Sequence, residues 1–97
     1  MFYRNSSSSA KAFQYLISHQ NSDGGWSGPG GGSSTTALTA MALTALRQCP
    51  EMPGKPAAIR KAVRYLLSGQ HGDGGFGDPG PTVRETALVY NALNGDP

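Results

Sequence analysis

Two seven-residue stretches, residues 20–26 (QNSDGGW) and residues 70–76 (QHGDGGF), repeat one pattern fifty positions apart. When residues 10–47 are aligned with residues 60–97 at this offset, 16 of the 38 paired positions hold the same residue. The matches extend beyond the two stretches and include the Thr-Ala-Leu segments at 36–38 and 86–88. A repeat of this length indicates an architecture in which each unit buries its apolar face only against a neighbouring unit.

Four segments around these stretches have the composition and periodicity of helices. The segment that ends near Gln20 and the segment that begins near Pro56 each carry a one-sided apolar stripe, which predicts helices with a solvent-facing side. The segments that follow residues 33–36 and the capping box at residues 82–85 are apolar almost all round, which predicts helices buried almost all round. We therefore predict an all-α fold of two tandem helical hairpins, in the order outer, inner, outer, inner.

The predicted domain boundaries follow from the serines and prolines. Residues 1–7 read as a disordered lead-in, with Ser8 or Ser9 as the N-cap of the first helix. Residues 8–97 form a single domain of two repeats, 8–48 and 55–95. The Pro-rich segment 49–54 joins them, because no helix continues through closely spaced prolines.

Composition excludes several classes of partner. The net charge is +2 with no basic cluster, so neither nucleic acid nor an anionic membrane surface is expected as a partner. The sequence has no apolar run long enough for a signal peptide or a membrane span. The single cysteine, Cys49, cannot form an internal disulfide and fits a reducing compartment. These features predict a soluble, cytoplasmic protein.

The repeat resembles the QW motif of terpene cyclases (squalene and hopene cyclases) and of protein prenyltransferase β-subunits. That motif has a basic residue, a small residue, an aromatic-Leu pair, a Gln and then Gly-x-Trp. The first copy matches it with Lys11-Ala12, Tyr15-Leu16, Gln20 and Gly24-Gly25-Trp26, and the second with Lys61-Ala62, Tyr65-Leu66, Gln70 and Gly74-Gly75-Phe76. Phe76, which stands where cyclases have Trp, is more similar to the prenyltransferase form.

The resemblance implies a partial α/α toroid, because the family closes about six such hairpins around an apolar cavity for isoprenoid chains. It implies a fastening role for the motif residues, since an amide both donates and accepts and can bridge two helix ends. The motif residues concerned are Gln20, Asp23, Gly24, Gly25, Trp26, Gln70, Asp73, Gly74, Gly75 and Phe76. The inner-helix residues that would line the cavity are Leu38, Met41, Ala42, Leu88 and Tyr90.

The catalytic groups of the family are not recognisable in this sequence. Cyclases of this fold protonate an alkene with an Asp-x-Asp-Asp cluster, in which crowding raises the pKa of one carboxyl. The aspartates here are isolated at positions 23, 73, 78 and 96. The zinc site of protein prenyltransferases needs Asp, Cys and His, but Cys49, His19 and His71 lack ligand spacing. No catalytic residue, metal site or cofactor is therefore predicted, and enzymatic activity is left undecided.

Three hypotheses for function remain at this point. The chain is a fragment or catalytically incomplete piece of a terpene-cyclase-like or prenyltransferase-like toroid that packs or binds an apolar isoprenoid-like ligand. Alternatively, it is part of an active enzyme whose catalytic residues lie on further sequence. Alternatively, it is a structural module that associates with itself, since the apolar faces at both ends of a two-hairpin unit favour association.

Overall fold

The computed structural model describes residues 6–77 and 80–94, and four helices follow one another in this part of the chain. Within it no strand forms, although single bridges pair Trp26 with Thr35 and Phe76 with Thr82. The predicted all-α fold is confirmed. The helices are α1 (Ser6–Ser18), α2 (Thr36–Gln48), α3 (Lys55–Ser68) and α4 (Val83–Leu93).

The inner helices α2 and α4 both begin at a threonine N-cap. The Thr35 hydroxyl accepts from the Leu38 amide at 3.2 Å, and the Thr82 hydroxyl accepts from the Glu85 amide at 3.0 Å. The predicted capping box at residues 82–85 is only half formed. The Glu85 carboxylate accepts from the Thr82 hydroxyl, because the Thr82 amide already donates to the Phe76 carbonyl.

The start of the first helix differs from the prediction. α1 begins at Ser6, ahead of both serines predicted as its N-cap, Ser8 and Ser9. Residues 1–5 of the predicted lead-in lie outside the described residues, as does Gly95, the last residue of the predicted second repeat. α4 ends at Leu93 with Asn94 as its C-cap.

The connector between the repeats is held by Lys55. Its ammonium donates to the Cys49 carbonyl at 2.5 Å and lies 3.7 Å from the Glu51 carboxylate, while the rest of the side chain is buried. Pro56 lies in the first turn of α3, where its missing amide proton costs no helical hydrogen bond. The connector is therefore anchored at the start of the helix that it leads into.

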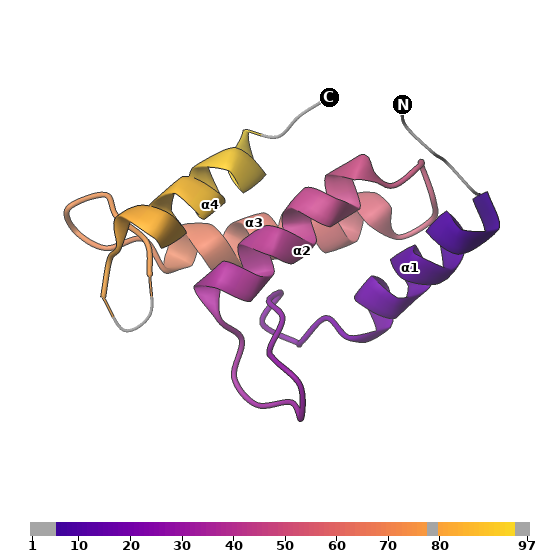
Figure 1. Cartoon of the computed structure of the whole chain (residues 1–97), viewed down its shortest axis with the longest axis horizontal. Coiled ribbons are helices and arrows are strands. Elements are labelled where there is room, and N and C mark those ends of the chain that lie inside the picture. The colour runs from indigo at the N-terminus through magenta and orange to yellow at the C-terminus, as the bar shows by residue number, and fades with distance from the viewer. Residues whose placement is uncertain (1–5, 78–79, 95–97) are drawn as a thin grey trace.

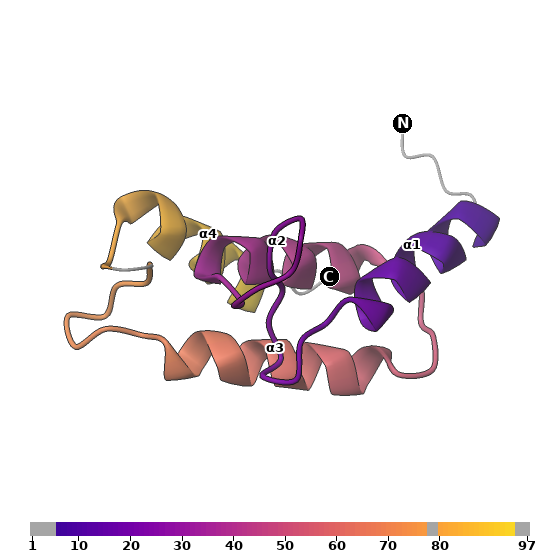
Figure 2. The same ribbon diagram turned by 90° about the horizontal axis from the view of Figure 1, so that it is seen from below.

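α2 is the central helix and packs against both α3 and α4, more extensively than against α1 (Figure 1). Figure 2 shows α2 and α4 in one layer, with α3 beneath them. α1 lies at the opposite end of α2 from α4. The second repeat thus packs its outer helix under the inner helix of the first repeat.

All four helices contribute residues to the core, and the aromatic turn residues Trp26 and Phe76 belong to it as well. Alanines are frequent in it, and their small side chains let the helices approach closely. The largest fully buried apolar residues are Phe13 of α1, Leu43 and Leu46 of α2, Leu66 of α3 and Val89 of α4.

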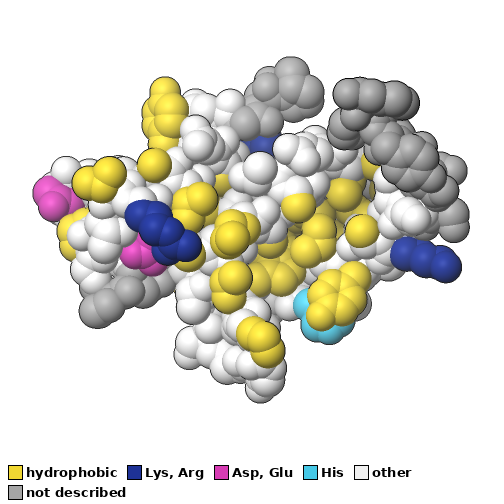
Figure 3. Space-filling model, viewed as in Figure 1, with side chains coloured by type: hydrophobic (Ala, Val, Ile, Leu, Met, Phe, Trp, Pro, Cys, Tyr) yellow, Lys and Arg dark blue, Asp and Glu magenta, His cyan; other side chains and the backbone are white. Residues whose placement is uncertain are grey.

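The prediction that the inner helices are buried almost all round is wrong. On α2, Leu38 is 36% and Met41 49% exposed, and on α4 Val83 and Tyr90 are more exposed still. In the described part of the chain, the other three helices cover each inner helix on only part of its circumference, so apolar side chains remain on the surface. Figure 3 shows them spread over the face that carries α2 and α4, with charged side chains mainly toward its two ends.

Leu43 provides a test of the core. Replacing it with Ala is expected to lower the free energy of unfolding by about 2–5 kcal/mol, because the deletion leaves a cavity at a fully buried site. Urea unfolding followed by circular dichroism measures this loss. The matched control is Leu67→Ala on α3, where the side chain is half exposed and the expected loss is under about 1 kcal/mol. Equal losses in the two variants would contradict the central position of α2.

Candidate functional site

The glutamine of each motif folds back over its own turn. Nε2 of Gln20 donates to the Gly24 carbonyl at 3.0 Å, and Nε2 of Gln70 donates to the Gly74 carbonyl at 2.9 Å. Gln20 also donates to the carbonyl of Ala58 at 3.1 Å, in the first turn of α3. Gln20 therefore joins the first repeat to the second, whereas the equivalent side chain, Gln70, is exposed.

The aspartate of each motif closes the turn that the glycines make. The Asp23 carboxylate accepts from the Gly25 amide and the Asp73 carboxylate from the Gly75 amide, both at 2.9 Å. Asp23 also accepts from the Ser34 hydroxyl at 2.7 Å. These carboxylates satisfy local donors, which is the role of an Asx turn.

The aromatic residue of each motif is tied to the following inner helix. The Trp26 amide donates to the Thr39 hydroxyl at 3.0 Å, and the Phe76 amide donates to the Thr86 hydroxyl at 2.9 Å. The Trp26 indole also donates to the Leu16 carbonyl in the last turn of α1, at 2.9 Å. A phenyl ring has no such donor, so Phe76 lacks this link to its outer helix.

These bonds show which residues of α2 and α4 are equivalent, and they correct the alignment made from the sequence. Thr39 and Thr86 hold equivalent places, as do the caps Thr35 and Thr82, and each pair is 47 positions apart. The alignment at an offset of 50 wrongly pairs Thr36 with Thr86. Sequence could not decide this, because α2 contains Thr-Ala followed by Leu or Met three times, at positions 36, 39 and 44.

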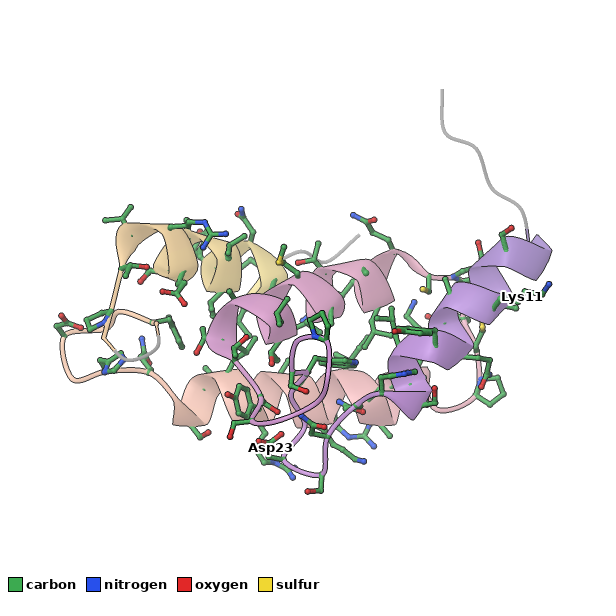
Figure 4. All side chains as sticks on the ribbon, turned by 60° about the horizontal axis from the view of Figure 1, so that its bottom comes forward. Lys11 and Asp23 are labelled. Carbon is green, nitrogen blue, oxygen red and sulfur yellow. The ribbon has the colours of Figure 1, made fainter. Side chains whose placement is uncertain are left out.

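Sequence analysis also missed the threonines as functional partners of the turns, and it missed Tyr65 as a link between repeats. The Tyr65 hydroxyl donates to the Ser34 carbonyl at 3.0 Å, from α3 to the loop before α2. A Cβ added at Gly24 would overlap the backbone carbonyl of Lys61, so α3 lies directly on the first turn. Figure 4 shows Asp23 in this turn beside α3, and Lys11 on α1 far from it.

The residues predicted to line a cavity are not brought together in one place. Leu38 lines a hollow of about 610 Å³ beside Trp26, and Tyr90 lines a separate groove of about 670 Å³ beside the second turn. Ala42 is buried in the core, Leu88 is half-buried and Met41 is exposed. Their contact with a ligand stays a prediction.

Two kinds of feature are not found in residues 6–77 and 80–94. Histidine, cysteine, aspartate and glutamate side chains do not gather there in any group of three or more that could hold a metal ion. None of the helices in the same range combines the length and apolarity that crossing a bilayer needs.

Comparison with known proteins identifies a family for this chain. The family model described as the squalene-hopene cyclase C-terminal domain matches residues 2–93, which is nearly the whole chain. No curated protein and no solved structure matched.

The two turn glycines allow the repeat interface to be tested within one chain. Gly24 and Gly74 have φ of +95° and +92°, so an alanine at either site costs about 1–2 kcal/mol in backbone strain. Only Gly24→Ala also pushes a methyl group into Lys61, which adds about 1–3 kcal/mol. At Gly74 the nearest atom is 3.9 Å away. Urea unfolding of dilute protein should therefore show the larger loss for Gly24→Ala, and a larger loss for Gly74→Ala would contradict the interface.

Proposed function

The chain belongs to the squalene-hopene cyclase C-terminal domain family, and from that premise we propose that it forms part of the wall of a terpene-cyclase-like toroid. In this proposal the inner helices serve two purposes. They pack against further hairpins, and they present apolar side chains to an isoprenoid-like ligand. In this proposal the chain acts as a binding and packing segment.

The observation that carries the ligand part is the hollow beside Trp26. It has a volume of about 610 Å³, within the range of small-molecule sites, and Trp26, Leu38 and Tyr15 contribute apolar surface to it. Its remaining wall is polar or glycine-rich, and it consists of the segment 18–21 at the end of the first outer helix and the loop 27–31. An apolar chain entering this hollow would remove the exposed part of Leu38 from water, which favours binding.

The exposed apolar residues of α2 support the same proposal. Leu38 and Met41 are three residues apart and lie on one side of the helix, away from the buried Leu43. A contiguous apolar patch on the surface of a soluble protein is typical of an interaction site. The ligand class follows from the family, and the apolar surface is the feature that suits it.

Trp26 provides the assay, because it is the single tryptophan of the chain and lines the hollow. Titration with farnesol or geranylgeraniol is expected to change its fluorescence in a saturable way. Leu38→Glu should weaken this binding by about tenfold, since it replaces an apolar contact with a charge that the ligand cannot solvate. The fold should tolerate the change, because the equivalent position in α4 is Glu85.

The control is Leu67→Glu, which places the same charge on the exposed outer side of α3, away from the hollow. It should leave the fluorescence titration unchanged. Equal weakening by both variants would mean that the compound adsorbs to any apolar surface, and absence of a saturable signal in the unaltered chain would remove the ligand from the proposal.

A further inference from the structure

The contact between the two repeats has two complementary surfaces. We call the first the turn face: the motif turn together with the side of the inner helix next to it, in the first repeat Gly24 with Thr36, Ala40 and Leu43. We call the second the helix face: one side of the outer helix, in the second repeat Ala58, Lys61, Ala62 and Tyr65. Within the chain, the helix face of the second repeat covers the turn face of the first.

The second repeat has a turn face of its own, which no helix in residues 6–77 or 80–94 covers. With the register of 47 positions, Val83, Ala87 and Tyr90 are equivalent to Thr36, Ala40 and Leu43. The three residues of α2 are buried, whereas Val83 is 88% and Tyr90 66% exposed and Ala87 is exposed as well. Together with Gly74, they line the groove of about 670 Å³.

The first repeat likewise has a helix face, on α1, that no other helix of the described part of the chain covers. Ser8, Lys11, Ala12 and Tyr15 lie fifty positions before Ala58, Lys61, Ala62 and Tyr65. Ala62 is fully buried, yet Ala12 is exposed, and the Tyr15 side chain is 63% exposed. These residues are on the opposite side of α1 from Phe13, which is buried.

We propose that a second copy of this chain docks head to tail, with the helix face of its α1 in the groove of the turn face at α4. The contacts between the two repeats, mapped onto the equivalent residues of two copies, predict which atoms form hydrogen bonds between the copies. Nε2 of Gln70 donates to the Ser8 carbonyl of the second copy, as Gln20 donates to Ala58. The Tyr15 hydroxyl of the second copy donates to the Pro81 carbonyl, as Tyr65 donates to Ser34.

The occupant is a second copy because one chain carries both halves of an interface that it already uses once. A Cβ at Gly74 would meet nothing closer than 3.9 Å, so the backbone there has room for Lys11 of a second copy, as Gly24 receives Lys61. Asp73 lines the groove, and Lys11 brings the opposite charge to it. A carbonyl oxygen has two lone pairs, so the Ser8 carbonyl can take part in its helix and accept from Gln70 as well.

One internal contact is not reproduced between copies. Arg47 donates to the Ala92 carbonyl at 2.7 Å at the end of α4, and the residue equivalent to Arg47 is Asn94, which is shorter and bonds within its own helix. The contact between copies is therefore weaker than that between repeats. Head-to-tail docking leaves one free face at each end, so it continues into a closed ring or an open chain of copies.

The test uses two variants that each block one face. Ala12→Arg places a long charged side chain on the helix face, and Ala87→Arg places one on the turn face. Both sites are exposed helical positions, so each variant should keep the circular dichroism spectrum and thermal unfolding of the isolated unit. Light scattering without ligand, at up to about 1 mM protein, is expected to show assemblies for the unaltered chain and a mass of 10.1 kDa for either variant alone.

Mixing the two variants distinguishes head-to-tail docking from every other mode of association. The Ala12→Arg variant keeps its turn face and the Ala87→Arg variant keeps its helix face. These two faces can dock, so the mixture should form a one-to-one dimer with twice the mass of the chain. The control is Gln14→Arg on another side of α1, where the equivalent residue is already Arg64, and it should assemble like the unaltered chain.

The proposal is overturned if the unaltered chain remains a monomer throughout this range. It is also overturned if either blocking variant assembles normally or if the mixture remains monomeric. A chain that assembles in this way without binding isoprenoids would leave this inference standing and remove only the ligand part of the proposed function. Isoprenoid binding by a chain that stays monomeric would overturn this inference and leave the ligand part of the proposed function standing.

Discussion

The packing of the two repeats depends on the absence of a side chain at Gly24. Its backbone lies against the Lys61 carbonyl in the middle of α3, at a distance that no other residue would allow. Gly24 also has a positive φ, which suits the turn that follows α1. The same residue thus belongs to the turn of the first hairpin and forms the surface on which the next outer helix packs. With α3 packed on Gly24, the Gln20 side chain reaches the Ala58 carbonyl and the Tyr65 hydroxyl reaches the Ser34 carbonyl. In this arrangement α2 lies at the centre of the core.

The motif aspartates and threonines hold the turn in the conformation that the packing of α3 on Gly24 requires. Asp23 and Asp73 satisfy the amide of the second glycine, and Thr39 and Thr86 satisfy the amide of the aromatic residue. Buried amides without partners are costly, so each of these polar groups fixes the position of the inner helix relative to the turn. The polar residues of the motif therefore hold the backbone, and they leave the apolar residues of α2 and α4 to form the surfaces available for partners and ligands.

The differences between the two repeats follow from what covers each of them. The first turn is covered by α3, so its glutamine has a second partner and its inner helix is buried along the side next to α3. The second turn has the same conformation but no third hairpin over it within the described residues, and the same positions are exposed. The apolar surface of this family member thus belongs partly to the seam between repeats and partly to the hollow beside Trp26, and the two surfaces suit different partners.

The sequence by itself determined the four helices, the two turns and the family, because apolar periodicity, glycine pairs and motif spacing are local properties of the chain. It also indicated that the glutamines could bridge repeats, but not that Ala58 receives Gln20. The tertiary structure decided the register of the inner helices, because three Thr-Ala pairs in α2 fit the sequence equally well and only the bond from Trp26 selects Thr39. It decided as well which apolar residues are exposed. Leu43 and Leu38 have the same side chain, and only the placement of α3 and α4 buries one and leaves the other at the surface.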